Sequence, residues 1–463
     1  MFRSHEGCWS FSKARMIALV LLIAASVTAS SQTFTIVHNF DNSEGAYSYF
    51  DNLTQGFDGN LWGTTFAQGA YDDGTAYRMT PEGSLTVLND FNSQYAQPEG
   101  ALVLAPSGIY YGVTPAGGTS NFGTVFSLDT KGTITVLHGF SGSDGNKPFG
   151  PLVLGSDGNL YGTTEFGGSS GNGTVFKITP SGTLTTLHSF EALRDDGYTP
   201  EGAALVEAPD GAFYGASEGG GPSDQGVLYR ITSSGNFAVV HNFDYTHGAT
   251  PYGTLVLASD GNLYGTTLRG GSNENGIIFR LELSGKFSVV HNFSFATDGG
   301  GPVAGMIQAT DNKLYGTTGD GGPDGYGTIF SFTTKGKFSV VNSFNFQAVD
   351  TDGIMQHTNG TLYGVTQYGG TYNNGVVYSL DVGTPPFAGI VPLFGRLGSN
   401  VRILGQGLTG SSAVKFNGIA AIFTVNSDTL ISATVPAGAT SGVIEVTTPG
   451  GPLGSKASFT ILK

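Results

Sequence analysis

Residues 148–190 read PFGPLVLGSDGNLYGTTEFGGSSGNGTVFKITPSGTLTTLHSF, and this unit returns throughout the chain. Its segments are short, rich in Val, Leu, Tyr, Phe and Thr, and bounded by Asp-Gly, Ser-Gly and Gly-Gly pairs that are typical of hairpin turns. No segment has a convincing helical period. The unit therefore predicts four short strands, over Pro148–Leu154, Leu160–Thr164, Gly173–Ile178 and Thr183–Phe190.

A large residue followed by Tyr-Gly-x-Thr marks each copy of the unit, with small variations. The glycines of the copies are Gly63, Gly112, Gly162, Gly215, Gly265, Gly316 and Gly364. Four strands in about fifty residues match one blade of a β-propeller, whose sheets bury their faces against two neighbours. A β-solenoid is the alternative fold.

The two ends of the repeat region distinguish these folds. The fourth-strand motif first occurs as Phe34–Phe40, before any complete repeat, whereas the seventh repeat stops after its third strand at Gly375–Leu380. The N-terminal strand is therefore predicted to complete the last blade, which leaves no open sheet edge. We expect an all-β fold in which residues 32–383 form a seven-bladed β-propeller of four-stranded blades.

The fifty-residue rhythm ends at Thr384-Pro385-Pro386, and a new alternating pattern follows. Residues 401–408 (VRILGQGL), 414–418 (VKFNG), 435–436 (VP) and 441–446 (SGVIEV) resemble the IPT/TIG immunoglobulin-like family. The resemblance implies a β-sandwich over residues 384–463 that serves as a spacer or contact module and carries no chemistry of its own.

The repeats have a resemblance of their own. Residues 167–176 (GGSSGNGTVF) and their relatives near Gly118, Gly271, Gly322 and Gly370 resemble the GloVer-type tandem repeats of secreted bacterial proteins. The resemblance covers about residues 33–382. It implies export and repetition, and it carries no biochemical activity over to this chain.

The N-terminus has the order of a secretory signal peptide. Arg3, Lys13 and Arg15 precede the apolar stretch Met16–Ala25, and small residues follow. We expect residues 1–31 to be removed and the protein to be secreted or to lie at the cell surface, in the extracellular space or the periplasm. A retained membrane anchor is the alternative, although the stretch is shorter than the roughly 20 residues that span a bilayer. Cys8 leaves with this segment, so the mature chain has no disulfide.

The charge balance restricts the partners. The chain has a formal net charge of -15, and removal of the signal peptide leaves 17 basic and 34 acidic residues. Nucleic acids and anionic membranes are bound chiefly through basic clusters, so neither is an expected partner. We expect no cofactor and no membrane insertion after cleavage.

Histidine occupies one place in the fourth strand of five repeats, and asparagine occupies it in the other two. These residues are His38, Asn89, His138, His188, His241, His291 and Asn342. A catalytic or metal site needs convergent groups, whereas these are distributed once per repeat. We expect a structural hydrogen bond between neighbouring blades, which either side chain can make.

Three further motifs carry little weight. The G-x-S-x-G match at residues 167–171 and the G-x-G-x-x-G match at residues 405–410 lack the helix that each motif needs. The Asp-Gly-Asn turns at Asp58, Asp157 and Asp260 offer carboxylates for calcium, but hairpin turns select the same residues without any metal. We therefore predict no catalytic or metal-ligating residue.

The connections from fourth to first strands and from second to third strands emerge on one face of a propeller. They carry aromatic rings beside carboxylates and carboxamides, which stack on sugars and hydrogen-bond their hydroxyls. The candidate ligand residues are Tyr71, Asp72, Asp73, Asp195, Asp196, Tyr198, Asp324, Tyr326, Tyr372 and Asn373.

These observations favour an exported, monomeric, non-catalytic binding or structural protein. Its partner is expected to be a polysaccharide, cell-wall material or an extracellular protein. The alternative is an extracellular propeller-type glycan lyase or hydrolase. Hydrolysis needs two carboxyl groups about 5–10 Å apart. The sequence singles out no such pair, and it lacks a sialidase-type Ser-x-Asp-x-Gly-x-Thr-Trp box.

Overall fold

The computed structural model describes residues 32–48, 53–191, 196–202 and 204–462. These residues form strands, turns and loops without any helix, so the prediction of an all-β protein is confirmed. The predicted signal peptide, residues 1–31, lies outside the described residues. None of the described segments is a helix long and apolar enough to cross a membrane.

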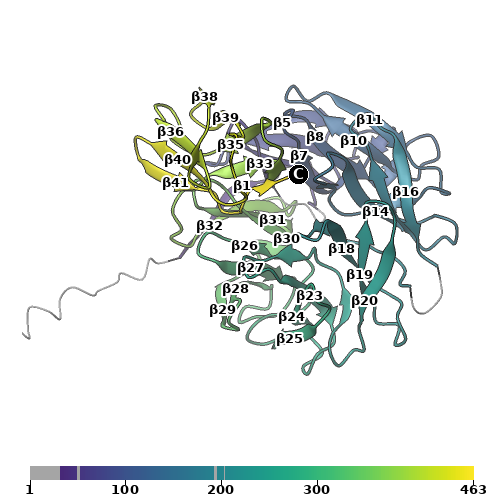
Figure 1. Cartoon of the computed structure of the whole chain (residues 1–463). Coiled ribbons are helices and arrows are strands. Elements are labelled where there is room, and N and C mark those ends of the chain that lie inside the picture. The colour runs from purple at the N-terminus through teal and green to yellow at the C-terminus, as the bar shows by residue number, and fades with distance from the viewer. Residues whose placement is uncertain (1–31, 49–52, 192–195, 203, 463) are drawn as a thin grey trace, which may run out of the picture.

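Seven sheets formed by the repeats radiate around a common centre in a β-propeller-like arrangement (Figure 1). We number these repeat sheets 1 to 7 in the order of their second strands. The first strands are β2 (Thr54–Gln55), β7 (Glu99–Leu104), β12 (Asn146–Pro148) with β13 (Val153–Leu154), β17 (Val206–Glu207), β21 (Ala249–Pro251) with β22 (Val256–Leu257), β26 (Ile307–Gln308) and β30 (Ala348–Gln356). The second strands are β3 (Leu61–Thr65), β8 (Tyr110–Thr114), β14 (Leu160–Phe166), β18 (Ala212–Ser217), β23 (Leu263–Arg269), β27 (Lys313–Thr318) and β31 (Leu362–Gly369).

The remaining strands of each repeat sheet lie farther from the centre. The third strands are β4 (Thr75–Met79), β10 (Thr124–Leu128), β15 (Thr174–Ile178), β19 (Val227–Thr232), β24 (Ile277–Leu281), β28 (Thr328–Thr333) and β32 (Val376–Asp381). The fourth strands are β5 (Leu85–Asp90), β11 (Ile134–Gly139), β16 (Leu184–Ser189), β20 (Phe237–Asn242), β25 (Phe287–Asn292), β29 (Phe338–Ser343) and β1 (Thr33–Asn39). The fourth strands are half-buried, and Figure 1 places β11, β16, β20 and β25 at the periphery.

Repeat sheet 7 joins the two ends of the repeat region. Strand β1 pairs antiparallel with β32, from Thr33 opposite Asp381 to Asn39 opposite Val376. The ring of Phe34 packs 5.2 Å from that of Tyr378, between ring centres. The N-terminal strand therefore supplies the fourth strand that the last repeat lacks, as the repeat pattern predicts.

Apolar side chains gather between the repeat sheets. Within the described residues, each pair of adjacent sheets shares one cluster of buried apolar residues. In the cluster between sheets 3 and 4, for example, Tyr161 stacks on Phe213 with ring centres 3.9 Å apart. The cluster between sheets 7 and 1 combines Val377 with Leu61 and thus closes the ring. Stability therefore depends on sheet-to-sheet contacts all the way around.

The glycine of the Tyr-Gly-x-Thr pattern has a steric cause. A Cβ added at Gly162 would lie 2.7 Å from Cζ of Phe176 on the neighbouring strand and 2.8 Å from Cδ2 of Leu152. The equivalent glycines, Gly112 and Gly265 among them, lie equally close to an aromatic ring of their third strand. Glycine recurs because the ring of the third strand occupies the space of a side chain.

We predict that Gly162→Ala destabilises the protein by about 1–3 kcal/mol, because overpacking a dense core forces neighbours to shift. Chemical denaturation should show this as a lower unfolding midpoint. Gly454→Ala is the matched control, since the nearest atom to its added Cβ is 3.9 Å away. The double variant Gly162→Ala, Phe176→Leu should recover part of the loss, and an undiminished midpoint for Gly162→Ala would contradict the explanation.

The chain beyond Asp381 forms separate sheets. One has the order β33 (Gly389–Val391), β35 (Asn400–Leu404), β39 (Leu430–Thr434), β38 (Phe423–Ser427). The second has the order β37 (Ile419–Ala420), β36 (Ala413–Phe416), β40 (Ile444–Thr448), β41 (Gly451–Gly454), and β34 (Phe394–Gly395) pairs with β42 (Thr460–Ile461). Val401, Phe416 and Val446 belong to a core that the sheets share.

Candidate functional site

Two sets of loops meet at one end of the repeat sheets. Within each sheet, the connection that leads into the first strand pairs with the connection between the second and third strands. Examples are β6 (Tyr95–Ala96) with β9 (Ala116–Gly117) in sheet 2, Tyr198 opposite Gly219 in sheet 4, and Ala348 opposite Gly369 in sheet 7. We call this end of the molecule the loop face.

The C-terminal region packs on the opposite end. Thr429 Oγ1 donates a hydrogen bond to the carbonyl oxygen of Phe57 at 2.9 Å, and Gln406 Nε2 donates one to Thr358 Oγ1 at 3.1 Å. Phe57 and Thr358 lie in the turns between first and second strands of sheets 1 and 7. Such turns lie at the other end of an antiparallel sheet, so the C-terminal region contacts the side away from the loop face.

Exposed aromatic side chains are confined to the loop face. Among the described residues, seven tyrosines and phenylalanines are exposed; six lie in the loops just defined, and Phe166 ends strand β14 at the same end of its sheet. They are Tyr71, Phe166, Tyr245, Phe295, Tyr326, Phe346 and Tyr372. Large exposed rings are unfavourable in water, so their confinement to one end makes the loop face the candidate ligand surface.

The predicted residues Tyr71 and Tyr372 occupy equivalent positions in adjacent sheets 1 and 7, with 65% and 60% of their surface exposed. Asp72 and Asn373 follow them with φ angles of 62° and 58°. Their side-chain oxygens accept hydrogen bonds from backbone N–H groups four residues earlier, at 3.3 and 3.2 Å. These two residues therefore hold the turns that present the tyrosines.

The other predicted residues are dispersed around the loop face. Asp324 and Tyr326 are exposed in sheet 6. Asp73 is half-buried, and burial followed by the charge of Asp72 raises its pKa. Tyr198 donates a hydrogen bond to Asp224 at 2.9 Å. Asp195 lies outside the described residues.

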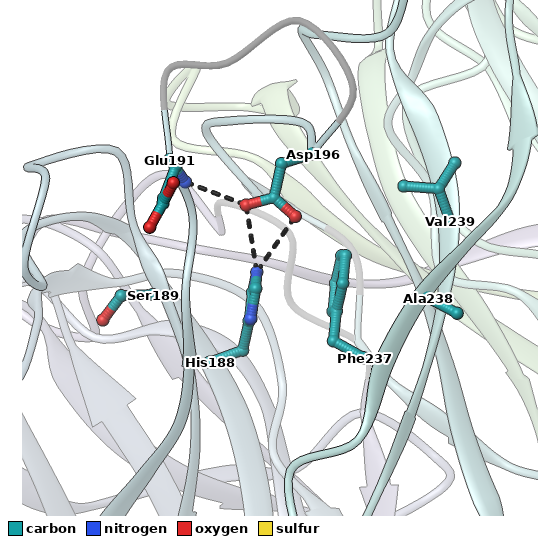
Figure 2. Close-up of a pocket in the computed structure, with 7 residues that line it drawn as sticks. All are labelled: His188, Ser189, Glu191, Asp196, Phe237, Ala238 and Val239. Atoms are coloured by element: carbon teal, nitrogen blue, oxygen red, sulfur yellow. Dashed lines mark hydrogen bonds and ion pairs between the residues drawn. The ribbon is translucent and has the colours of Figure 1, made fainter.

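Asp196 lies in a pocket of about 570 Å³ on the outer edge between β16 and β20, which Figure 2 shows. Both of its carboxylate oxygens lie 3.2 Å from Nε2 of His188, and one accepts the backbone N–H of Glu191 at 2.9 Å. The ring of His188 stacks on Phe237, with ring centres 3.8 Å apart. Asp196 therefore fastens the start of a loop to the fourth strand.

This arrangement recurs in other repeats. Nε2 of the strand histidine lies 2.8–3.2 Å from a carboxylate that begins the next loop, in the pairs His38–Glu44, His138–Asp144, His188–Asp196 and His291–Asp298. The predicted bond to the neighbouring sheet is present where Nδ1 of His38 faces the carbonyl oxygen of Gly83 at 3.0 Å and Asn89 donates to Gly132 at 2.8 Å. Within the part of the chain that the structure describes, Nε2 of His241 is buried without a hydrogen-bond partner, and burial lowers the pKa of His241 to about 4. Within the described residues, the predicted bond between neighbouring sheets is thus found at His38 and Asn89, whereas Asn342 donates to the carbonyl oxygen of Ser343 on its own strand at 3.1 Å.

A second group of side chains lies near the inner ends of sheets 3, 4 and 5, and sequence reasoning missed it. We call Lys147, Glu165, Glu201, Glu218 and Tyr252 the inner cluster. Lys147 Nζ lies 3.7 Å from Glu165 Oε2, and Tyr252 donates a hydrogen bond to Glu201 Oε1 at 3.3 Å. The Lys147 ammonium also lies 5.4 Å from the ring centre of Phe166.

The carboxyl groups of the inner cluster perturb one another. Burial, followed by the negative charges of Glu201 and Glu165, raises the pKa of Glu218 to about 8. Burial and then Glu201 raise the pKa of Glu165, against the opposing effect of Lys147. Within the described residues, Oε1 of Glu218 is buried without a hydrogen-bond partner. Burial also raises the pKa of Glu201, so the site favours the protonated form of its carboxyl groups, that of Glu218 most strongly.

A positional signal for this cluster exists in the sequence. Glu165 and Glu218 each lie three residues after the glycine of the Tyr-Gly-x-Thr pattern, at the end of the second strand or directly after it. The other repeats have Phe66, Pro115, Leu268, Gly319 and Gln367 at that place. An alignment of the repeats by their glycines would have shown two adjacent repeats with glutamate at one inner position.

Comparisons with known proteins agree with this architecture. A family model described as the Gloeobacter/Verrucomicrobia repeat matches residues 24–208 and 202–421. No curated protein matches the sequence.

Two solved structures share the fold at low sequence identity. Virginiamycin B lyase from Staphylococcus aureus is 15% identical, with a TM-score of 0.51 over 76% of this chain and 98% of its own. A fungal alcohol oxidase of the AA5 family, solved in complex with copper, is also 15% identical, with a TM-score of 0.53 over 93% of this chain and 99% of its own. These likenesses concern the fold alone.

Proposed function

The chain belongs to the Gloeobacter/Verrucomicrobia repeat family, and from this premise we propose that it is an exported, non-catalytic bacterial protein that binds glycan through its loop face. The confinement of all seven exposed aromatic rings to that face is the observation that carries the proposal. Aromatic faces stack on the apolar faces of sugar rings, while the neighbouring carboxylates and carboxamides hydrogen-bond the hydroxyls.

The proposal includes the finer architecture. The seven repeat sheets are the blades of a seven-bladed β-propeller over residues 32–383, and residues 384–463 form an IPT/TIG immunoglobulin-like sandwich. Two four-stranded antiparallel sheets with a common core support the sandwich. The C-terminal region forms its hydrogen bonds with the end opposite the loop face. The loop face is therefore not covered by these contacts and can bind a partner such as a polysaccharide or cell-wall material.

The expected site of action is outside the cytoplasm, at the cell surface or in the secreted fraction. Support comes from the order of basic, apolar and small residues at the N-terminus. We propose that the protein acts as a monomer, because closure of the ring pairs the ends of the repeat region with each other.

We predict that the double variant Tyr71→Ala, Tyr372→Ala weakens binding to the recognised glycan roughly tenfold or more, because each ring contributes about 1 kcal/mol of stacking. Pull-down on cellulose, chitin and peptidoglycan, followed by titration on the polymer retained, measures the effect. Ile422→Ala is the matched control, since its side chain is 83% exposed on the C-terminal region. Retention equal to that of the unmodified protein, or no retention by any of these polymers, would refute glycan binding by this face.

A propeller-type glycan lyase or hydrolase is the second candidate, and the inner cluster favours it. A protonated Glu218 beside ionisable Glu165 and Glu201 provides a proton donor and acceptors in one place. An enzyme releases soluble sugar fragments during prolonged incubation with the polymer, whereas a binding protein releases none. That measurement separates the two functions.

A further inference from the structure

Three of the exposed aromatic residues occupy the same position in consecutive repeats. Tyr245, Phe295 and Phe346 each lie two residues after the buried phenylalanine that ends a fourth strand. They are 41%, 52% and 70% exposed, and they introduce sheets 5, 6 and 7. The same position in the other described repeats is held by Asn42, Ser93 and Gly142. We call the three rings the aromatic arc.

The backbone of each residue of the arc lies in a short, hydrogen-bonded turn; around Phe346, the N–H of Ala348 donates to the carbonyl oxygen of Asn345 at 2.9 Å. The carbonyl oxygen of Tyr245 accepts the N–H of Gly271 at 2.8 Å, and that of Phe295 accepts the N–H of Gly322 at 2.7 Å. The ring of Phe295 lies close against Gly300 and Gly321, where an added Cβ would be 3.1 Å from it. The backbone that carries these rings is therefore fixed before any ligand arrives, which lowers the entropic cost of binding.

The surroundings of the arc are polar. Asp244 and His247 form an exposed pair at 2.9 Å beside Tyr245, and Asn345 and Gln347 are exposed on either side of Phe346. Rings that are one repeat apart and separated by polar side chains do not form the continuous apolar core of a protein interface. A glycan chain instead presents successive sugar rings with apolar faces for the aromatic side chains and hydroxyl groups for the polar side chains between them.

We propose that the aromatic arc binds one extended, neutral polysaccharide chain, which crosses sheets 5, 6 and 7 and stacks one sugar on each ring. The inference rests on the proposed glycan-binding function and specifies its ligand. The formal charge of -15 disfavours polymers of uronic acids, since like charges repel. Once one sugar of the chain is bound, the next sugars are held near the remaining rings at a high effective concentration. Each further ring therefore adds to the affinity.

Titration calorimetry with oligomers of the neutral glycan that the full chain retains, from disaccharide to polymer, tests the proposal. We expect affinity to rise steeply with length and to level off once all three rings are spanned. Tyr245→Ala, Phe295→Ala and Phe346→Ala should each lower polymer affinity roughly fivefold and leave disaccharide affinity nearly unchanged. Thermal unfolding of each variant shows whether the fold is intact.

A gain of function gives a second readout. Asn42 holds the equivalent position at the entry to sheet 1, next to Phe346 around the ring, so Asn42→Tyr should lengthen the oligomer at which affinity levels off. Equal affinity for disaccharide and polymer, or tighter binding of a uronic-acid polymer, would overturn the arc while leaving glycan binding by the loop face in place. Failure of every glycan to bind would instead remove the proposed function itself.

Discussion

Deletion of β1, residues Thr33–Asn39, should abolish cooperative unfolding and cause self-association. The strand makes six residue pairs with β32, and it places Phe34 and Ile36 against the cluster between sheets 6 and 7. Backbone hydrogen bonds contribute about 0.5–1.5 kcal/mol each and a buried apolar side chain about 1.5–3 kcal/mol. The loss is on the order of 10 kcal/mol, comparable with the whole stability of a typical domain.

Self-association follows because the deletion leaves β32 as an open edge with unpaired N–H and carbonyl groups. Thermal denaturation and size-exclusion chromatography with light scattering measure both effects. Thr35→Ala is the matched control, because that side chain is exposed on the same strand. A peptide of residues 33–40 added in trans should restore part of the monomer. A truncated chain that remains monomeric and unfolds at the original temperature would show that β1 does not close the ring.

The closing strand could be predicted from the sequence because the strand motifs of a repeat can be counted. One fourth-strand motif precedes the first repeat, and the last repeat lacks one. The recurring glycine of the Tyr-Gly-x-Thr pattern was also visible in the sequence. Its steric cause acts within one sheet, because the ring of Phe176 covers Gly162 on the adjacent strand. Contacts inside a repeat, or between one repeat and the next, recur in every repeat, so the residues that make them recur at the same position of the repeat sequence.

The inner cluster was not predictable in the same way. Glu165 comes from the end of strand β14, Glu201 and Glu218 come from two different loops, and their mutual influence depends on burial at the inner ends of the sheets. Sequence spacing does not encode that burial. Likewise, the carboxylate partner of each strand histidine lies six residues on for His38, eight for His188 and seven for His291. Because the number of residues between histidine and carboxylate varies, the sequence does not show that the interaction repeats. The prediction of Asp196 as a ligand residue therefore rested only on its position in a loop.

The exposed aromatic residues of the loop face were partly predicted. Tyr71, Tyr326 and Tyr372 were selected from the sequence as rings in variable loops, and all three are exposed. Phe295 and Phe346 were not selected, because a phenylalanine next to a strand is usually core. Only the contrast with the buried Phe293 and Phe344, two residues earlier, shows that the second ring of each pair lies outside the core.

Glu218→Gln should make the protein more stable at pH 8, by a few kcal/mol. The pKa of Glu218 is about 8 in the folded protein, against an ordinary value of 4.5, so the folded chain holds a proton that the unfolded chain releases. Ionisation of the unfolded state then lowers the free energy of unfolding as pH rises from 4.5 to 8, with a ceiling of about 5 kcal/mol before solvent screening. Glutamine does not ionise and escapes this loss.

The variant and the unmodified protein should therefore differ little at pH 4.5 and diverge as pH rises, in denaturant titrations across that range. Glu82→Gln, on an exposed turn, is the matched control and should track the unmodified protein at every pH. Parallel curves for Glu218→Gln would contradict the raised pKa.

A buried carboxyl that lowers stability at neutral pH is retained when it serves a function, because mutation readily removes such a cost. If the stabilised variant also stops releasing sugar fragments that the unmodified protein releases, Glu218 acts as a proton donor; if glycan binding is unchanged and no fragments arise from either protein, the aromatic rings carry the function.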